Sequence, residues 1–294
     1  MISLNSYIAV DWGTTNRRAY RIGPDGRNEA EFEDGKGILS LSDGGFAAAV
    51  GEIRERLGDL PLLMAGMIGS NRGWKEAPYV PCPAGLDEIA AALVWPEPDR
   101  SAIVPGASFV DDDRADVMRG EEVQLLGAVA AGLIGADALA CHPGTHNKWV
   151  RLAGGRIAEF RTVMTGELFN LLKEKSILAE LLHDKAEPDA AFRAGVRQGL
   201  KGEALTADLF SARARVLLGR LDRADASSWV SGLLIGGDVR TGTAGASGEV
   251  AVMGRPELTA LYAAALDEAG FACREVDGEQ AFLAGIAEIA RRLS

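Results

Sequence analysis

The stretch YIAVDWGTTNR, at residues 7–17, decides the fold because its pattern returns as ALACHPGTHNK at residues 138–148. Each copy opens with a short apolar run, which predicts a buried strand, and passes through a Gly-Thr-x-Asn turn to a basic residue. The two copies align without a gap, and an apolar-polar strand follows each of them. Such a repeat predicts two α/β halves built to one plan by an ancient duplication.

The two turns have the chemistry of an anion-binding site. Glycine allows close approach of a ligand, backbone N–H groups form an anion-binding concavity, and threonine and basic side chains add donors. One copy alone would favour a plain hairpin turn, whereas the repetition favours phosphate binding. The expected phosphate-binding residues are Gly13, Thr14, Thr15, Asn16 and Arg17 in the first turn, and Gly144, Thr145, Asn147 and Lys148 in the second turn.

An acid precedes the first turn only. Asp11 ends the first strand, and its carboxylate is expected to hold a magnesium ion, through water. The equivalent position of the second copy is His142. The sequence has no G-x-x-x-x-G-K-[ST] motif, and no G-x-G-x-x-G follows the first strand, which excludes a P-loop and weakens a dinucleotide interpretation.

Composition narrows the class of protein. The chain has 294 residues, of which 47% are hydrophobic, and a net charge of -11, which argues against a nucleic-acid partner. No apolar run approaches the roughly 18 residues of a membrane span, and the start does not resemble a signal peptide. Three widely spaced cysteines do not suggest a disulfide framework. We therefore expect a cytoplasmic protein without membrane or nucleic-acid partners; its oligomeric state stays open, a homodimer included.

Three segments carry a wider resemblance, at residues 11–16 (DWGTTN), 143–148 (PGTHNK) and 252–254 (VMG). In this order they resemble the two phosphate motifs and the adenosine motif of the sugar kinase, heat-shock 70 and actin superfamily. The resemblance implies an actin-like ATPase architecture: two α/β, ribonuclease H-like lobes with a nucleotide cleft between them, binding ATP and Mg²⁺. We expect residues 1–133 to form the lobe with the sugar site and residues 134–294 the nucleotide-binding lobe, whose final helix is free to pack back on the first.

Longer matches narrow the resemblance, at residues 64–71 (MAGMIGSN), 73–74 (GW), 118–122 (MRGEE), 160–168 (FRTVMTGEL) and 231–236 (SGLLIG). Together they resemble the 2-dehydro-3-deoxygalactonokinase family. The resemblance implies ATP-dependent phosphorylation of 2-dehydro-3-deoxygalactonate on its 6-hydroxyl, in galactonate catabolism. The alternatives are a kinase of another 2-keto-3-deoxy sugar acid or small sugar, and a non-catalytic nucleotide-dependent regulator.

The resemblance also indicates a catalytic base. In glycerol kinase and xylulokinase a Gly-Asp pair opens the corresponding helix, and that Asp is the base. Here Gly120 is followed by Glu121, which we expect to take this role. Because Glu is one methylene longer than Asp, the choice between Glu121 and Glu122 stays open, and charge complementarity at a helix N-terminus is the alternative for both. Asp11 is the alternative catalytic acid.

A glycine-rich loop and part of the second half are expected to hold the sugar acid. The expected substrate-binding residues are Gly69, Ser70, Asn71, Trp74, Arg161, Thr165 and Glu167. The substrate carboxylate requires a cation, for which the candidates are Arg72, Lys75, Arg119 and Arg161. Core packing is the alternative for Trp74, and helix capping for Glu167.

The adenine and ribose slot is expected at three glycines. Gly236 and Gly237 interrupt a predicted helical stretch, and Gly254 follows the predicted strand at residues 250–253. The alternative for the first two is close packing between helices.

Overall fold

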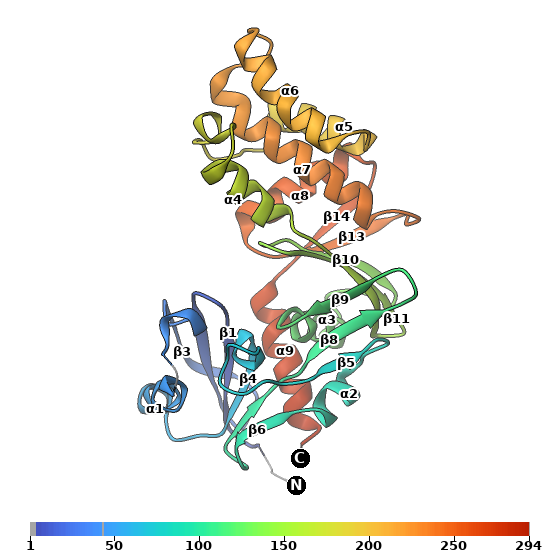
Figure 1. Ribbon diagram of the computed structural model, residues 1–294. Helices are drawn as coiled ribbons and strands as arrows, with labels where there is room; N and C mark the ends of the chain where they lie inside the picture. The colour runs from blue at the N-terminus through green and yellow to red at the C-terminus, as the bar shows by residue number, and fades with distance from the viewer. Residues whose placement is uncertain (1–3, 43, 294) are drawn as a thin grey trace. The chain divides into compact units, whose positions relative to one another are not determined.

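The structure, a computed structural model, describes residues 4–42 and 44–293, and these form two compact units (Figure 1). Unit 1 consists of the chain up to Asp137, the segment Leu152–Glu159 and the chain from Gly278 onward. Unit 2 consists of Ala138–Arg151 and Phe160–Asp277. The chain therefore passes between the units four times, and the boundary expected between residues 133 and 134 lies close to the first passage.

Unit 1 contains a six-stranded sheet with the order β3-β2-β1-β4-β7-β6. Its strands are β1 (Tyr7–Trp12), β2 (Arg17–Ile22), β3 (Asn28–Asp34), β4 (Leu62–Gly66), β6 (Val94–Glu97) and β7 (Ser101–Ile103). β1 pairs antiparallel with β2 and parallel with β4, which pairs parallel with β7. The apolar residues of β1 are buried because the strand lies inside the sheet. The carboxyl ends of β1 and β4 meet at one edge, where open α/β sheets bind their ligands.

The second sheet has five strands in the order β12-β11-β10-β13-β14 and belongs to unit 2, except for the segment Leu152–Glu159, which belongs to unit 1. Its strands are β10 (Ala138–His142), β11 (Asn147–Ala153), β12 (Arg156–Val163), β13 (Glu249–Met253) and β14 (Ala272–Val276). The central strand β10 pairs parallel with β13, as β1 does with β4. The order therefore repeats that of β3, β2, β1, β4 and β7, and the predicted construction of two α/β halves on one plan is confirmed.

Among the described residues, four helices and a small sheet complete unit 1. Helix α1 (Gly45–Leu57) packs Phe46, Val50 and Ile53 into a core with β1. The others are α2 (Leu86–Ala91), α3 (Glu121–Ala130) and α9 (Gly278–Arg291), with the short 3-10 turns η1 (Ile38–Ser40) and η2 (Met67–Gly69). The small sheet consists of β5 (Tyr79–Pro81), β8 (Gly106–Val110) and β9 (Ala115–Met118), which pair in the order β5-β8-β9.

Helices α3 and α9 cross so closely that each needs a glycine at the contact. A Cβ on Gly127 of α3 would lie 2.0 Å from the carbonyl oxygen of Ala281, and a Cβ on Gly285 of α9 would lie 2.1 Å from that of Val123. The last helix is thus fixed in unit 1 by backbone-to-backbone packing.

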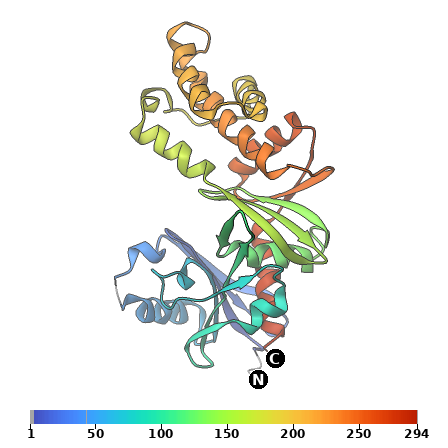
Figure 2. The ribbon, with the colours of Figure 1, turned by 45° about the vertical axis from the view of Figure 1, so that its right-hand side comes forward.

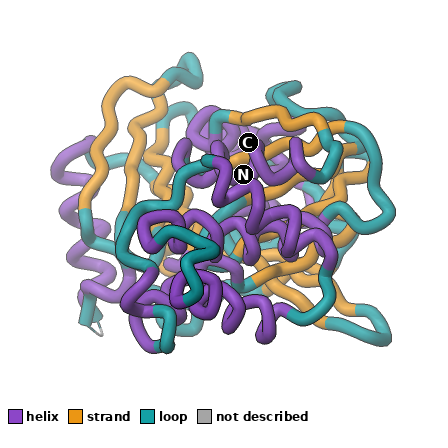
Figure 3. Tube along the Cα trace, turned by 90° about the horizontal axis from the view of Figure 1, so that it is seen from above, coloured by secondary structure: helices purple, strands orange, loops and turns teal. Residues whose placement is uncertain are grey.

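Helices of unit 2 lie on one side of its sheet (Figure 2). They are α4 (Thr165–Lys175), α5 (Ala190–Lys201), α6 (Leu205–Leu217), α7 (Ala226–Gly242) and α8 (Pro256–Glu268), with the 3-10 turns η3 (Ala179–Leu181) and η4 (Arg223–Asp225). Figure 3 distinguishes the helices from the strands by colour. Within the described ranges, no helix is both long and apolar enough to cross a membrane.

Candidate active site

The first turn is held from one side by the segment around η1. The N–H of Gly37 donates to the carbonyl oxygen of Thr15 at 2.9 Å, and the N–H of Leu39 donates to that of Thr14 at 3.2 Å. A Cβ on Gly37 would lie 2.4 Å from the Thr14 oxygen, so only glycine fits there. The carbonyls are thereby paired, while the side chains of Thr14 and Thr15 stay exposed.

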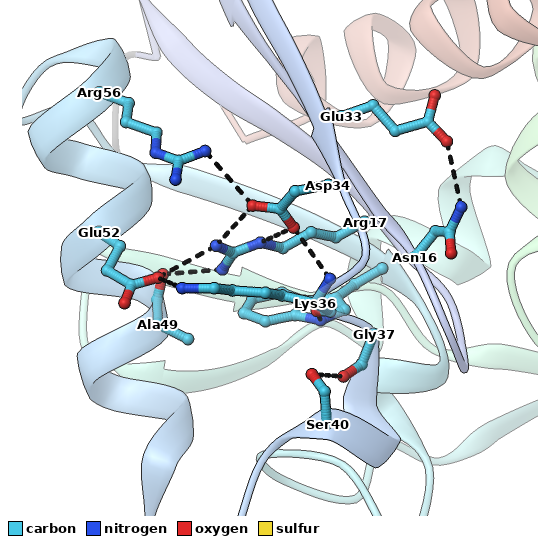
Figure 4. A network of polar contacts seen from close by, with 11 residues as sticks. Asn16, Arg17, Glu33, Asp34, Lys36, Gly37, Ser40, Ala49, Glu52 and Arg56 are labelled. Carbon is cyan, nitrogen blue, oxygen red and sulfur yellow. Dashed lines mark hydrogen bonds and ion pairs between the residues drawn. The ribbon is translucent and has the colours of Figure 1, made fainter.

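Arg17, at the exit of the first turn, is fully buried and points to acids of β3 and α1 (Figure 4). Its Nε donates to Asp34 at 2.9 Å, its Nη2 to Glu52 at 3.2 Å, and its Nη1 to the carbonyl oxygen of Ala49 at 3.0 Å. Its guanidinium also lies 5.2 Å from the ring centre of Trp12. The expectation that Arg17 binds phosphate is therefore wrong, because these partners occupy its donors and fix β2 to β3 and α1.

Asn16, which precedes Arg17, lies on the surface. Its Nδ2 donates to Glu33 at 3.3 Å, and its side chain is exposed (Figure 4).

Asp11 and Glu121 form the acidic part of the site. Asp11 lies at the carboxyl end of β1, beside Ala65 of β4, and Glu121 is the first residue of α3. Burial raises the pKa of Asp11 to about 6; Arg18 opposes this shift, and the carboxylates of Glu121 and Glu33 add to it. The described residues contain no cluster of three or more His, Cys, Asp or Glu side chains suited to a metal ion.

Two glycines allow these elements to converge. Gly66 ends β4 at φ +95°, and a Cβ there would lie 2.8 Å from the carbonyl oxygen of Trp12. Gly120 precedes α3 at φ +107°, and its Cβ would lie 3.2 Å from the Cα of Gly66. The positive φ and the lack of space both require glycine, and they bring the start of α3 against the ends of β1 and β4.

The two glutamates at the start of α3 lie in different environments. Glu122 is fully buried, and both oxygens of its carboxyl group accept the N–H of Gly120, at 2.9 and 2.7 Å. Burial, with the nearby charge of Glu121, raises the pKa of Glu122 to about 8. Glu121 is half-buried, and its Oε2 accepts the N–H of Arg119 at 3.2 Å. Of the two, Glu121 is the one with access to solvent.

The glycine-rich loop after β4 lies in the same region. Ser70 is buried and its Oγ accepts the N–H of Arg72 at 3.3 Å, whereas Asn71 is exposed. Trp74 is half-buried and packs against the core of unit 1, in agreement with the alternative of core packing. Gly69 is buried, and a Cβ on it would lie 2.9 Å from Nη1 of Arg119.

Arg119 has an unusual environment for a cation. Its Nη2 donates to the carbonyl oxygen of Ala77 at 2.8 Å, and its guanidinium lies 4.3 Å from the ring centre of Tyr79. Its Nε and Nη1 are buried and have no hydrogen-bond partner among the described residues. Arg72 and Lys75 are exposed instead, and so is Arg161 on β12.

The second turn, in unit 2, is held differently from the first. Asn147 is fully buried, and its Nδ2 donates to Asp238 at 3.0 Å, so the expectation that it binds phosphate is wrong. Lys148 is also buried, with Nζ 3.4 Å from the carbonyl oxygen of His146. Thr145 remains exposed, and Gly144 is half-buried.

Two expected substrate residues lie at the start of α4, next to the second turn. Thr165 is buried and its Oγ1 donates to Asp238 at 2.6 Å, so its hydroxyl proton is used within the protein, and its role in substrate binding stays a prediction. Glu167 contacts the ring of His146 through its carboxylate, and its N–H donates to the carbonyl oxygen of Thr145 at 3.0 Å. The start of α4 therefore supports the second turn.

The glycines expected at the adenosine slot have different environments. Helix α7 continues through Gly236 and Gly237 without interruption. A Cβ on Gly236 would lie 2.4 Å from the carbonyl oxygen of Val196, so close packing with α5 explains it and the adenosine role is wrong. Gly237 is half-buried with no atom nearer than 4.0 Å to its Cβ position, and Gly254 is half-buried beside Pro143.

Asp238 was not anticipated from the sequence. It is the one acid in α7, whose other residues near it, such as Ile235 and Val239, are buried and apolar. An acid within an apolar helix was the available signal, since a buried carboxylate requires partners.

Comparisons with known proteins identify the family to which the chain is similar. A family model described as 2-keto-3-deoxy-galactonokinase matches residues 11–289. A Rhizobium meliloti protein named probable 2-dehydro-3-deoxygalactonokinase is 41% identical over 307 residues, covering 100% of this chain and 99% of the relative. The Escherichia coli 2-dehydro-3-deoxygalactonokinase is 39% identical, with 98% of both chains covered.

Comparison with solved structures shows which fold the chain has. The crystal structure of a Sinorhizobium meliloti protein described under the same enzyme name superposes with a TM-score of 0.92 at 40% identity, covering 98% of this chain and 99% of that one. The activator of the 2-hydroxyisocaproyl-CoA dehydratase from Clostridium difficile superposes with a TM-score of 0.52 at 10% identity, covering 98% and 96%. The second likeness concerns the fold alone. The expected α/β fold of the actin-like ATPases and sugar kinases is confirmed.

Proposed function

The chain belongs to the 2-keto-3-deoxy-galactonokinase family of carbohydrate kinases, and on that premise we propose that it transfers the γ-phosphoryl group of ATP to the 6-hydroxyl of 2-dehydro-3-deoxygalactonate. The products are the 6-phosphate and ADP, and the reaction belongs to galactonate breakdown in the cytoplasm. The observation that carries the proposal is the pair of carboxylates, Asp11 and Glu121, at the carboxyl edge of the unit 1 sheet.

The exposed threonines and the acid next to them fit the phosphate and metal roles. Thr14 and Thr15 present hydroxyl groups in unit 1, and Thr145 presents one in unit 2. The residues present also fit a magnesium ion, because Asp11 offers carboxylate oxygens and neighbouring acids add negative charge. Mg²⁺ usually takes one or two carboxylates together with phosphate oxygens and water. When bound, the ion would neutralise charge on the transferred phosphoryl group.

Glu121 is proposed as the general base. Its carboxylate takes the proton of the 6-hydroxyl as that oxygen forms a bond to the γ-phosphorus and the bond to ADP breaks. Its half-buried position supports this role, whereas Glu122 is enclosed and holds the Gly120 N–H. Glu121→Gln is expected to lower kcat by about 10²–10⁴-fold and leave the KM for ATP nearly unchanged. An equal loss of kcat in Glu122→Gln would remove the distinction between the two acids.

Arg119 is proposed as the cation for the substrate carboxylate. A guanidinium with two buried, unpaired nitrogens needs an anionic partner, and its Nη1 lies against Gly69 of the glycine-rich loop. Arg119→Met retains an apolar stem over Tyr79 and removes the charge. It is expected to raise the KM for the sugar acid at least tenfold and to leave the KM for ATP unchanged.

Arg114→Met is the matched control for this variant. Arg114 also lies over an aromatic ring, 4.3 Å from the ring centre of Phe109, and pairs with Glu159. A similar rise in the sugar-acid KM in both variants would show that loss of stacking, and not loss of the charge, is responsible.

The activity itself is tested by coupled detection of ADP with purified protein, ATP and Mg²⁺. We expect turnover with 2-dehydro-3-deoxygalactonate and much less with its C4 epimer, with an aldonic acid that lacks the 2-keto group, and with glycerol. Turnover with glycerol and none with any sugar acid would overturn the substrate assignment. Omission of Mg²⁺ is expected to abolish turnover.

A further inference from the structure

A buried carboxylate in unit 2 collects hydrogen bonds from four side chains. Asp238 is 2% exposed. Its Oδ1 accepts from Trp149 Nε1 at 2.7 Å, and its Oδ2 accepts from Asn147 Nδ2 at 3.0 Å and Thr165 Oγ1 at 2.6 Å. The hydroxyl group of Tyr262 also donates to Oδ2. A carboxylate has about four acceptor sites, so Asp238 is fully used within the protein.

The donors come from the elements that surround the second turn. Asn147 is the first residue of β11 and the exit of the turn, and Thr165 is the first residue of α4. The next residue, Gly166, packs so tightly on the turn that a Cβ would lie 2.5 Å from the carbonyl oxygen of Gly144. Tyr262 lies on α8, the helix that follows Gly254. One side chain on α7 thus joins the turn, the helix that supports it and the helix after the expected adenosine motif.

We propose that Asp238 is the positioning residue of the second turn, setting the conformation in which unit 2 binds the phosphates of a nucleotide. The proposal rests on the proposed function only in taking ATP as the ligand of this turn. Asp238 does not touch the nucleotide. It acts through Asn147 and Thr165, which both donate a hydrogen bond to its carboxylate.

An amide could not replace this carboxylate. Asparagine at this position has one oxygen acceptor and presents an NH₂ group to at least one of the four donors, which leaves two donors facing each other in a buried site. Unsatisfied buried polar groups destabilise the folded state, and this is relieved by movement of the elements that hold the donors. One of those elements, the start of β11, forms the exit of the second turn, and another, α4, supports the turn.

The first experiment compares Asp238→Asn with the wild-type protein by titration calorimetry, measuring the Kd for ATP in the absence of a sugar acid. We expect the Kd for ATP to rise about tenfold or more, while the KM for the sugar acid changes less than twofold. Tyr262→Phe removes one donor and keeps the ring in the core, and it is expected to raise the Kd for ATP about threefold. If Asp238→Asn does not fold, the Kd of Tyr262→Phe for ATP tests the proposal.

Leu266→Ala is the control for a loss of stability alone. Leu266 is fully buried in α8, in the same core as Tyr262, and has no part in the hydrogen-bond network. We expect it to lower Tm and leave the Kd for ATP unchanged. An unchanged Kd for ATP in Tyr262→Phe and in folded Asp238→Asn would overturn the proposal, and so would a wild-type protein that does not bind ATP. A wild-type protein that binds ATP without phosphorylating a sugar acid would instead overturn the proposed function and leave this inference standing.

Discussion

Glu122→Gln should change how the stability of the protein depends on pH. Glu122 is fully buried in α3, and burial together with the charge of Glu121 raises its pKa from 4.5 to about 8. At neutral pH its carboxyl group is therefore largely protonated in the folded protein and ionised in the unfolded chain. Glutamine has nearly the same shape, still accepts the N–H of Gly120 through its oxygen, and cannot ionise.

The direction and size of the effect follow from the proton balance. Because the folded pKa lies above the unfolded one, the folded state holds a proton that the unfolded state has released. The contribution of Glu122 is fully present below about pH 4.5 and is lost as the pH rises through 8. Within this window the folding equilibrium loses nearly a factor of ten per pH unit, or about 2–3 kcal/mol between pH 5 and pH 7.

The assay is urea unfolding of the wild-type protein and Glu122→Gln at pH 5, 6, 7 and 8, followed by tryptophan fluorescence. Subtraction of the two free energies of unfolding at each pH cancels the other titrating groups, and the variant should gain about 2–3 kcal/mol relative to wild type from pH 5 to pH 7. Glu55→Gln, the same chemical change on the exposed side of α1, should follow the wild-type curve. Parallel curves for wild type and Glu122→Gln would refute the assignment of a protonated Glu122.

Two further variants test the packing of unit 1. Gly285→Ala places a methyl group 2.1 Å from a backbone oxygen of α3 and should lower the free energy of unfolding by about 1–3 kcal/mol. Gly51→Ala in α1 is the control, because no atom lies within 4 Å of its Cβ position, and it should not lower the free energy of unfolding. Equal changes of both variants in urea unfolding would contradict this. Arg17→Lys loses the forked contact with Asp34 and should lower the stability measured by thermal unfolding by about 1–3 kcal/mol. Arg18→Lys should lower it by less than about 1 kcal/mol, because the ion pair of Arg18 with Glu33 is exposed. Equal losses in the two lysine variants would show that burial of the pair has no effect.

The plan of the fold could be predicted because its signals are local. An apolar run followed by a Gly-Thr-x-Asn turn determines a strand, a turn and the next strand, and its repetition indicates a second sheet of the same order. The acid at the end of the first strand and the Gly-Glu pair opening a helix were also visible, and the structure brings both to one edge of the unit 1 sheet.

The partners of buried polar side chains could not be predicted, because they depend on segments distant in the chain. Asn147 and its acceptor Asp238 are 91 residues apart in the sequence, and Arg17 and its acceptor Glu52 are 35 residues apart. Nothing in the Gly-Thr-x-Asn-basic pattern distinguishes a side chain that faces a ligand from one that anchors the turn. Gly236 presented the same difficulty, since close helix packing and close ligand approach both require the absence of a Cβ.

The corrected residues give the repeated motif a different meaning. In each copy a polar residue at the exit of the turn is fully buried and bound to an acid of its own unit: Arg17 to Asp34 on β3, and Asn147 to Asp238 on α7. The two copies therefore share an anchored exit, although the anchoring residue occupies a different position of the motif in each. The threonine side chains of the two turns stay exposed, and these are the ones proposed to meet the phosphates. The repetition that predicts phosphate binding thus also reflects a structural need, since a backbone that binds an anion must be held rigid by buried side chains.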